Sequence, residues 1–195
     1  MIQFMRALTE EEKFRVQQIF DGNEEITALT NSVELHQFAW NYNWDDHNWV
    51  YLNWIVRNPL CDKGTALLLY WKHVPRWYYG KYGRWERERK SDRTQFYAEW
   101  ADFRKNYSQA FAKREEFEKY YGKEYVKKPY DLLKEIEEKY LDGFYTLQNI
   151  SFDPTNDNGY NWTNDYNDME LKQEIPAEMK IASPGSVPIR EYFQT

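Results

Sequence analysis

The spacing of hydrophobic residues in the first part of the chain predicts two helices. The first begins after Thr9, which forms a capping box with Glu12 three residues later, and it ends at Gly22. The second begins after Ser32. Apolar residues at helical spacing predict the buried stripes, which are Val16, Ile19 and Phe20 in the first helix and Leu35, Phe38, Ala39 and Tyr42 in the second.

A third helix is predicted to start at Asp45 or Asp46, because a carboxylate suits a helix N-terminus, and to end before Pro59. Apolar residues occur almost all round this helix, which indicates that it lies between neighbouring helices. They form two stripes, one of Trp49, Leu52 and Val56 and one of Tyr51, Trp54 and Ile55.

A fourth helix has Asp62 or Thr65 as its cap and is closed by Pro75. The link between the third and fourth helices is short, so the two are expected to form an antiparallel hairpin. The buried face of the fourth helix is predicted to contain Ala66, Leu67, Tyr70 and Trp71.

The longest helical pattern runs from Phe96 to Tyr121, with apolar residues, all aromatic except Ala110, at intervals of four and three and an interruption at Arg114. Its rings are too bulky for regular knobs-into-holes packing, so we interpret it as a helix that packs on the body of the protein. The alternative is a dimer seam. The sequence leaves the oligomeric state open.

A shorter helix, capped by Asp131 and ending at Gly143, follows this pattern. Its predicted buried residues are Leu132, Leu133, Ile136 and Tyr140. The period then changes to two, which predicts one or two short strands before Pro154. The alternating apolar residues are Tyr145, Leu147, Ile150 and Phe152.

Residues 155–168 contain no aliphatic side chain, and three prolines follow, which predicts a polar loop and an extended tail. The fold class predicted from these patterns is mainly α: antiparallel helical hairpins packed as a multi-helix bundle, with a short β or extended C-terminal segment. We expect residues 1–150 to form the helical globular domain and residues 151–195 to form a loop and tail packed on it.

Composition refines this picture. Aromatic residues make up 19% of the chain, and we expect most of the rings to fill the core, the alternative being an exposed surface for a partner. Cys61 is the single cysteine, which is typical of a reducing cytoplasm. The sequence shows no signal-peptide pattern and no apolar run that would span a membrane. A cytoplasmic, membrane-free location is therefore expected.

The net charge of −6 argues against a nucleic-acid partner, because phosphate contacts need a clustered positive surface. Residues 24–46 and 153–178 are acidic, whereas residues 76–90 are basic. Such charge segregation is typical of solvated helix faces. The acidic segments also suit a protein partner with a basic surface.

One stretch of the sequence, within residues 30–80, carries a family resemblance. Its groups are Leu35-His36, Asn43-Trp44-Asp45-Asp46, Pro59-Leu60-Cys61-Asp62-Lys63-Gly64-Thr65-Ala66-Leu67 and Tyr70-Trp71. This run resembles the bacterial family named domain of unknown function 4274. The resemblance implies a bacterial protein with a helical core and a place among small acidic proteins that neutralise toxins. It implies no catalytic residue, since no activity is established for that family.

The strongest local cluster of polar residues lies at the two helix starts that the predicted hairpin brings together. It comprises Asn43, Trp44, Asp45, Asp46 and His47 with Cys61 and Asp62. Helix capping explains these residue types, and we favour that structural role. The alternative is a polar pocket of a small enzyme or ligand-binding protein.

Metal, nucleotide and nucleophile chemistry find little support. No two histidines have the i, i+4 spacing of a helical metal site, and no glycine-rich phosphate loop or serine elbow occurs. We therefore expect no metal and no cofactor. Cys61 is adjacent to Asp62, whose anion raises the pKa of a thiol, so a buried inert thiol is expected.

The loop from Asp153 to Asp168 contains Asn156-Asp157-Asn158-Gly159, which is similar to part of an EF-hand. The register fails, because alignment on Gly159 puts Pro154 at the first ligand position and Asp165 at the last. We interpret it as a solvated loop, with an irregular calcium site as the alternative.

The sequence hypothesis is thus an interaction protein, more an inhibitor of the immunity type than an enzyme. It would bind a basic toxin or another basic protein through an acidic and aromatic surface, in which charge speeds encounter and rings anchor the complex. The candidate binding residues of this surface are Asp45, Asp46, Trp162, Asp165 and Tyr166.

Overall fold

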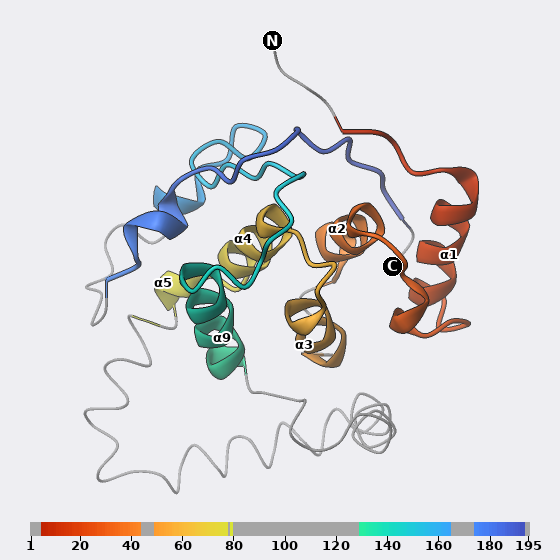
Figure 1. Cartoon of the computed structure of the whole chain (residues 1–195), viewed down its shortest axis with the longest axis horizontal. Helices are drawn as coiled ribbons and strands as arrows, with labels where there is room; N and C mark the ends of the chain where they lie inside the picture. The colour runs from red at the N-terminus through yellow and green to blue at the C-terminus, as the bar shows by residue number, and fades with distance from the viewer. Residues whose placement is uncertain (1–4, 44–48, 78, 80–128, 165–173, 194–195) are drawn as a thin grey trace, which may run out of the picture.

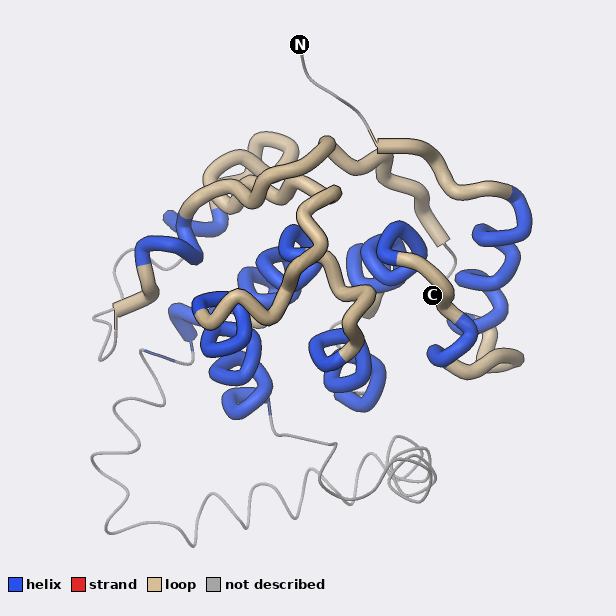
Figure 2. Tube along the Cα trace, in the orientation of Figure 1, coloured by secondary structure: helices blue, strands red, loops and turns tan. Residues whose placement is uncertain are grey.

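The protein folds around a group of packed helices. The computed structural model describes residues 5–43, 49–77, 79, 129–164 and 174–193 (Figure 1). The α-helices are α1 (Glu10–Phe20), α2 (Ser32–Asn41), α3 (Trp49–Arg57), α4 (Lys63–Lys72), α5 (Pro75–Trp77) and α9 (Pro129–Leu141). Short 3-10 turns are η1 (Ile26–Ala28), η5 (Trp162–Asn164) and η6 (Ala177–Lys180). Figure 2 shows only helices and loops in these ranges, so the mainly α prediction is confirmed.

The first helix has the ends that its sequence predicts. Thr9 Oγ1 accepts a hydrogen bond from Glu12 N at 3.2 Å, and Thr9 N donates to Glu12 Oε2 at 2.8 Å. Val16 and Ile19 are buried, and Gly22 follows the helix with φ +74°, a conformation that glycine adopts without a steric penalty.

The second helix places its predicted stripe in the core. Leu35, Phe38, Ala39 and Tyr42 are all buried. Its cap is Asn31, one residue before the predicted Ser32, because Asn31 Oδ1 accepts hydrogen bonds from the N–H groups of Val33 at 3.0 Å and Glu34 at 3.1 Å.

The third helix has α2 and α9 as its main partners. Leu52, Ile55 and Val56 are buried there, while Tyr51 and Trp54 are half-buried. The predicted hairpin with α4 is therefore revised: the two helices are consecutive, but α4 packs chiefly on α9 and α2. The predicted start of α3 at Asp45 or Asp46 lies outside the described residues.

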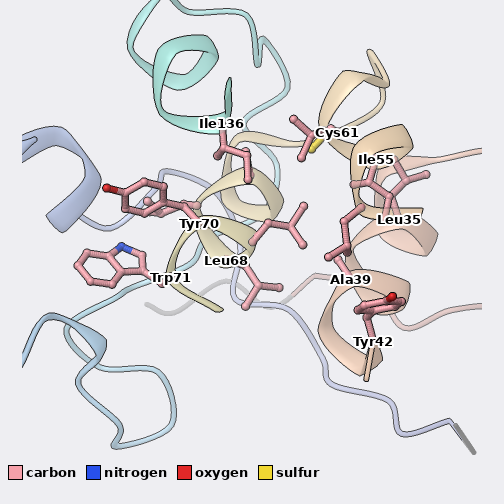
Figure 3. Packing of buried hydrophobic residues seen from close by; sticks show 14 of the residues in the cluster. Leu35, Ala39, Tyr42, Ile55, Cys61, Leu68, Tyr70, Trp71 and Ile136 are labelled. Carbon is pink, nitrogen blue, oxygen red and sulfur yellow. The ribbon is translucent and has the colours of Figure 1, made fainter. Parts of the chain in front are cut away.

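The fourth helix is the centre of the core. Every residue from Gly64 to Trp71 is buried, more than the single face predicted, because the sequence between Lys63 and Lys72 contains no charge. Figure 3 shows Leu68 with Leu35, Ala39 and Ile55 to one side and Tyr70 and Trp71 to the other. Full burial of a Leu side chain contributes about 2 kcal/mol, so α4 is a large part of the core's stabilisation.

The ninth helix buries Leu132, Leu133, Ile136 and Tyr140, as predicted. Its start differs from the prediction. The helix begins at Pro129, and Asp131 lies inside its first turn rather than at the cap. Proline at the first helical position has a preset φ and needs no N–H partner there, which favours this earlier start.

The segment after α9 is extended but forms no regular strand in the described residues. Its only ladder-like contact there is an isolated parallel bridge between Ile150 and Ser186. The predicted short strands are therefore replaced by an extended segment. The physical reason is that the N–H groups of Asn149 and Ile150 donate to the Asp62 carboxylate, at 2.7 and 3.3 Å, and are not available for a longer ladder.

Residues 187–193, which we call the C-terminal strap, cross α2 and reach α1 (Figure 1). The side chains of Gln37 and Asn41 hold the strap through its backbone: Gln37 Nε2 donates to Ile189 O, and Asn41 Nδ2 donates to Glu191 O at 2.7 Å. Glu191 Oε1 accepts from Leu8 N at 2.8 Å, which ties the strap to the chain's first described segment.

A charge network connects α1 and α2. Glu12 accepts two hydrogen bonds from Arg6, both at 2.6 Å, and the fully buried Glu34 accepts one from Arg15 Nε at 2.7 Å. Asn31 Nδ2 donates to both carboxylates, at 2.8 and 3.0 Å. These bonds compensate the cost of burying the two carboxylates.

The long helical pattern predicted over residues 96–121, with its alternative role as a dimer seam, lies outside the described residues. None of the helices in the described part of the chain combines the length and the apolar character that a membrane crossing requires.

Candidate functional site

Asp62, one of the predicted site residues, is fully buried at the start of α4. Its carboxylate accepts hydrogen bonds from three backbone N–H groups: Gly64 at 2.9 Å, Asn149 at 2.7 Å and Ile150 at 3.3 Å. Burial raises the pKa of Asp62, and these bonds oppose that shift. Asp62 thus caps α4 and joins it to the extended segment. Both oxygens of this carboxylate therefore already accept hydrogen bonds from the backbone.

The other residues of the predicted hairpin cluster divide into two groups. Asn43 is exposed, whereas Trp44, Asp45, Asp46 and His47 lie outside the described residues. Cys61 is buried, and burial, with Asp62 beside it, raises the pKa of its thiol far above the usual range. A thiol that stays protonated at neutral pH is a poor nucleophile.

The Asp/Asn-rich loop is attached to the strap and to its own Trp162. Asp157 Oδ1 forms an ion pair with Arg190 Nη2, and Asp157 Oδ2 accepts from Trp162 Nε1 at 2.9 Å. Both oxygens of this buried carboxylate therefore have protein partners. Among the described residues, no three His, Cys, Asp or Glu side chains gather as metal ligands. The contacts of Asp157 make it unsuitable as a ligand of the calcium site considered above.

Trp162 is half-buried and packs against the core, so it is only partly available to a partner. Its neighbour Tyr160 is 45% exposed and contacts the Trp162 ring edge to face, with 4.7 Å between ring centres. Asp165 and Tyr166 lie outside the described residues. Tyr160 is therefore the exposed aromatic ring that the structure shows on this loop.

A pocket of about 310 Å³ opens between α2, the loop at residues 151–158 and the strap. Sequence reasoning missed it because its walls come from three distant segments. Its lining residues are His36, Trp40, Ser151, Phe152, Asp153, Asn156, Asp157, Asn158, Val187, Pro188 and Arg190.

Two cations lie on the Trp40 side chain beside this pocket. The guanidinium carbon of Arg190 is 3.7 Å from the centre of the Trp40 ring, and Lys72 Nζ is 4.5 Å from it. Lys72 Nζ also donates to Trp40 O. Burial lowers the pKa of Lys72 to about 8, so most of these side chains are still charged at neutral pH.

His36 lies in the same lining and is buried. Its Nδ1 is 3.0 Å from Thr65 Oγ1, and burial, followed by the charges of Arg190 and Lys72, lowers its pKa to about 3. The ring is therefore neutral at physiological pH, and Nε2 is the nitrogen left without a hydrogen bond to the described residues.

A second surface that sequence reasoning missed is on α1. Phe14 is 66% exposed, and three acidic residues share its side of the helix, because Glu10 lies four residues before it, Glu11 three residues before it and Asp21 seven residues after it. Glu24 and Glu25 follow in the exposed turn. We call these six residues the acidic face of α1. The signal was present in the sequence: Phe14 does not fit the stripe of Val16, Ile19 and Phe20.

Comparison with known protein families identifies a match in the first part of the chain. The family model described as domain of unknown function (DUF4274) matches residues 30–112, which extends beyond the run that carries the resemblance. No curated protein and no solved structure matches the chain significantly. The match covers α2, α3, α4 and α5 in full. Residues 30–112 of this chain are therefore similar to the family domain of unknown function 4274.

Proposed function

We propose that this chain is a protein-binding module, an inhibitor of the immunity type in the bacterial cytoplasm, that binds a basic toxin or another basic protein. The observation that carries the proposal is the acidic face of α1, where the exposed Phe14 lies one turn after Glu10 and Glu11 on the same side of the helix. An exposed phenyl ring gains binding energy when a partner covers it, and aromatic anchors dominate many interfaces.

The carboxylates of this face are accessible to a partner. The side chains of Glu10 and Glu11 are 92% and 84% exposed, and their ion pairs, to Lys13 at 3.0 Å and to Arg15 at 3.7 Å, are within the same helix. Exposed pairs of this kind contribute little to stability. Exchange of these contacts for a partner's Lys or Arg therefore costs little free energy. The negative surface also accelerates encounter with a positive one.

The surface predicted from the sequence remains part of the proposal. Asp45, Asp46, Trp162, Asp165 and Tyr166 stay candidate contacts, and the exposed Tyr160 adds a ring to the loop. Ion pairing and ring anchoring would act there as they do on α1. Binding, rather than catalysis, is the function that these features support.

The test is capture of a partner with three matched baits: the wild type, Phe14→Ser and Tyr192→Ser. Tyr192 is 82% exposed on the strap, outside the acidic face, and serves as the control. We expect a basic partner whose capture is lost with Phe14→Ser, is retained with Tyr192→Ser and weakens with salt in the purified complex. Equal capture by all three baits, or an acidic partner, would contradict the proposal.

A further inference from the structure

We propose that the pocket between α2, the 151–158 loop and the C-terminal strap is a binding site for a neutral polyhydroxylated molecule, of the size of a monosaccharide. No step of the proposed protein binding uses this pocket. Its volume of about 310 Å³ is at the lower end of the ~300–1,000 Å³ typical of small-molecule sites.

The walls of the pocket are held in place by specific contacts. Arg190 and Asp157 join the strap to the loop, and Asn41 and Gln37 fasten the strap to α2. A further hydrogen bond joins the loop to the residue just before the strap: Ser151 N donates to Ser186 O at 2.9 Å. Because these contacts already hold the loop and the strap in place, few side chains need to become ordered when a ligand enters, which favours binding of a small molecule.

The charges around the pocket compensate one another. Arg190 is paired with Asp157, and the positive charge of Lys72, which lies on Trp40, is opposite in sign to the remaining carboxylate of the lining, Asp153. His36, the remaining titratable group of the lining, is neutral at physiological pH. A ligand with a net charge would find no excess of opposite charge here, so a neutral ligand fits best.

The polar groups of the lining both donate and accept hydrogen bonds. Asp153 Oδ1 accepts from Thr155, which leaves Oδ2 for a ligand, and the amide of Asn158 is exposed at the rim. The buried His36 offers Nε2. Hydroxyl groups donate and accept at once, so vicinal hydroxyls match this mixture.

The remaining wall is apolar and suits the C–H face of a sugar ring. Phe152, Val187 and Pro188 supply it. Apolar walls with a few placed polar groups are the usual composition of small-molecule sites. A phosphate or a metal ion would gain no binding energy from such an apolar wall, whereas a pyranose can pack an apolar face against it.

The probes are D-glucose, D-galactose and D-mannose, titrated into the full chain and followed by amide NMR shifts and by saturation transfer to the sugar. We expect at least one sugar to bind saturably and to shift the amides of residues 151–158 and 187–190. Glucose 6-phosphate and glucosamine should bind no more tightly than glucose. Absence of saturable binding by all three sugars, or tighter binding of a charged analogue, would overturn the proposal.

Two variants localise the binding. Asn158 has φ +54°, which glycine tolerates, so Asn158→Gly removes the amide without strain and should weaken binding about fivefold. Val187→Trp should fill the pocket and abolish binding. The matched control is Asn23→Gly at an exposed site beyond α1. Wild-type affinity in both pocket variants, with folding verified by their NMR spectra, would place the sugar elsewhere and refute this site.

Discussion

Gly64 and Ile150 lie so close together that a Cβ atom on Gly64 would be 2.1 Å from the carbonyl oxygen of Ile150. The clash is with backbone, which cannot rotate away. We therefore expect Gly64→Ala to push the extended segment off α4 and to lower the free energy of unfolding by about 3 kcal/mol, measured by urea denaturation.

Substitution of a second glycine, Gly22, serves as the control, because it introduces backbone strain without a clash. Gly22 has φ +74° and no heavy atom within 4 Å of its virtual Cβ. Gly22→Ala should therefore cost only about 1 kcal/mol. Equal losses in the two variants would show that the contact between Gly64 and Ile150 is not as tight as described.

Glu12 should make stability depend on acid pH. Its hydrogen bonds from Arg6 lower the pKa of Glu12 to about 2 in the folded state, against an ordinary value of 4.5. A depressed carboxyl pKa stabilises the fold above the ordinary value, and this contribution is lost as the pH falls from 4.5 towards 2. Arg6 is half-exposed, so we expect Glu12→Gln to cost only about 1–2 kcal/mol at neutral pH.

The measurement is urea unfolding of wild type and Glu12→Gln across this pH range. The difference between the two proteins should vanish at the acid end. Glu10→Gln, on the same turn but with a 92% exposed side chain, is the control and should match the wild type throughout. A gap between wild type and Glu12→Gln that is independent of pH would contradict the assigned role.

Two buried histidines should add a separate pH dependence. Burial lowers the pKa of His36 to about 3 and that of His73 to about 4, from an ordinary 6.5. Below pH 6.5 the unfolded chain takes up protons that the folded chain does not, so stability is lost as the pH falls from 6.5 towards 4. Each histidine contributes a slope of up to about 1.4 kcal/mol per pH unit.

NMR of the imidazole Cε1–H signals tests this directly. The signals of His36 and His73, assigned with His36→Gln and His73→Gln, should keep neutral-ring shifts between pH 8 and pH 5 in the folded protein. Ordinary titration near pH 6.5 in either ring would show that the ring is more accessible than the structure indicates.

Cys61 should be unreactive in the folded protein. It is 1% exposed, and burial raises its thiol pKa well above the usual range. A disulfide reagent at mildly alkaline pH should therefore label it only as fast as the protein opens, and rapidly in urea. Rapid labelling under native conditions would reopen the nucleophile interpretation that this geometry disfavours.

The strap should become more mobile when the side chain of Asn41, which binds its backbone, is removed. Asn41 Nδ2 donates to Glu191 O at 2.7 Å, and Phe193 N donates to Asn41 Oδ1 at 3.2 Å. We expect Asn41→Ala to speed amide hydrogen exchange at Phe193 about tenfold, while Asn23→Ala leaves it unchanged. Unaltered exchange in Asn41→Ala would mean that other contacts hold the strap.

Local signals in the sequence predicted the helices well. Thr9 and Glu12 are three residues apart, and the stripe from Leu35 to Tyr42 repeats within one helix, so the information lies within a few neighbouring positions. The predicted start of α9 was wrong by three residues, because a helix capped by Asp131 would begin at Leu132, whereas α9 begins at Pro129. Both Pro129 and Asp131 are acceptable near a helix N-terminus.

Contacts between distant segments were not predictable in this way. Asp62 was identified as a cap, but nothing near it in the sequence indicates that it also binds the backbone at residues 149–150. The same holds for Arg190, whose partners Asp157 and Trp40 are far away in the chain. Such pairings depend on the tertiary fold, which is why the helices could be predicted from the sequence and the pocket could not.

The strap has a consequence for the order of events during protein synthesis. Gln37 and Asn41 emerge from the ribosome early, whereas residues 189–193, whose backbone they bind, emerge after the helices of the described residues. These helices can therefore form while the two amides still lack their partners in the strap, and the contacts with the strap form afterwards. A chain that lacks residues 187–193 would expose the side of α2 that the strap covers, so the strap shields these two amides from water.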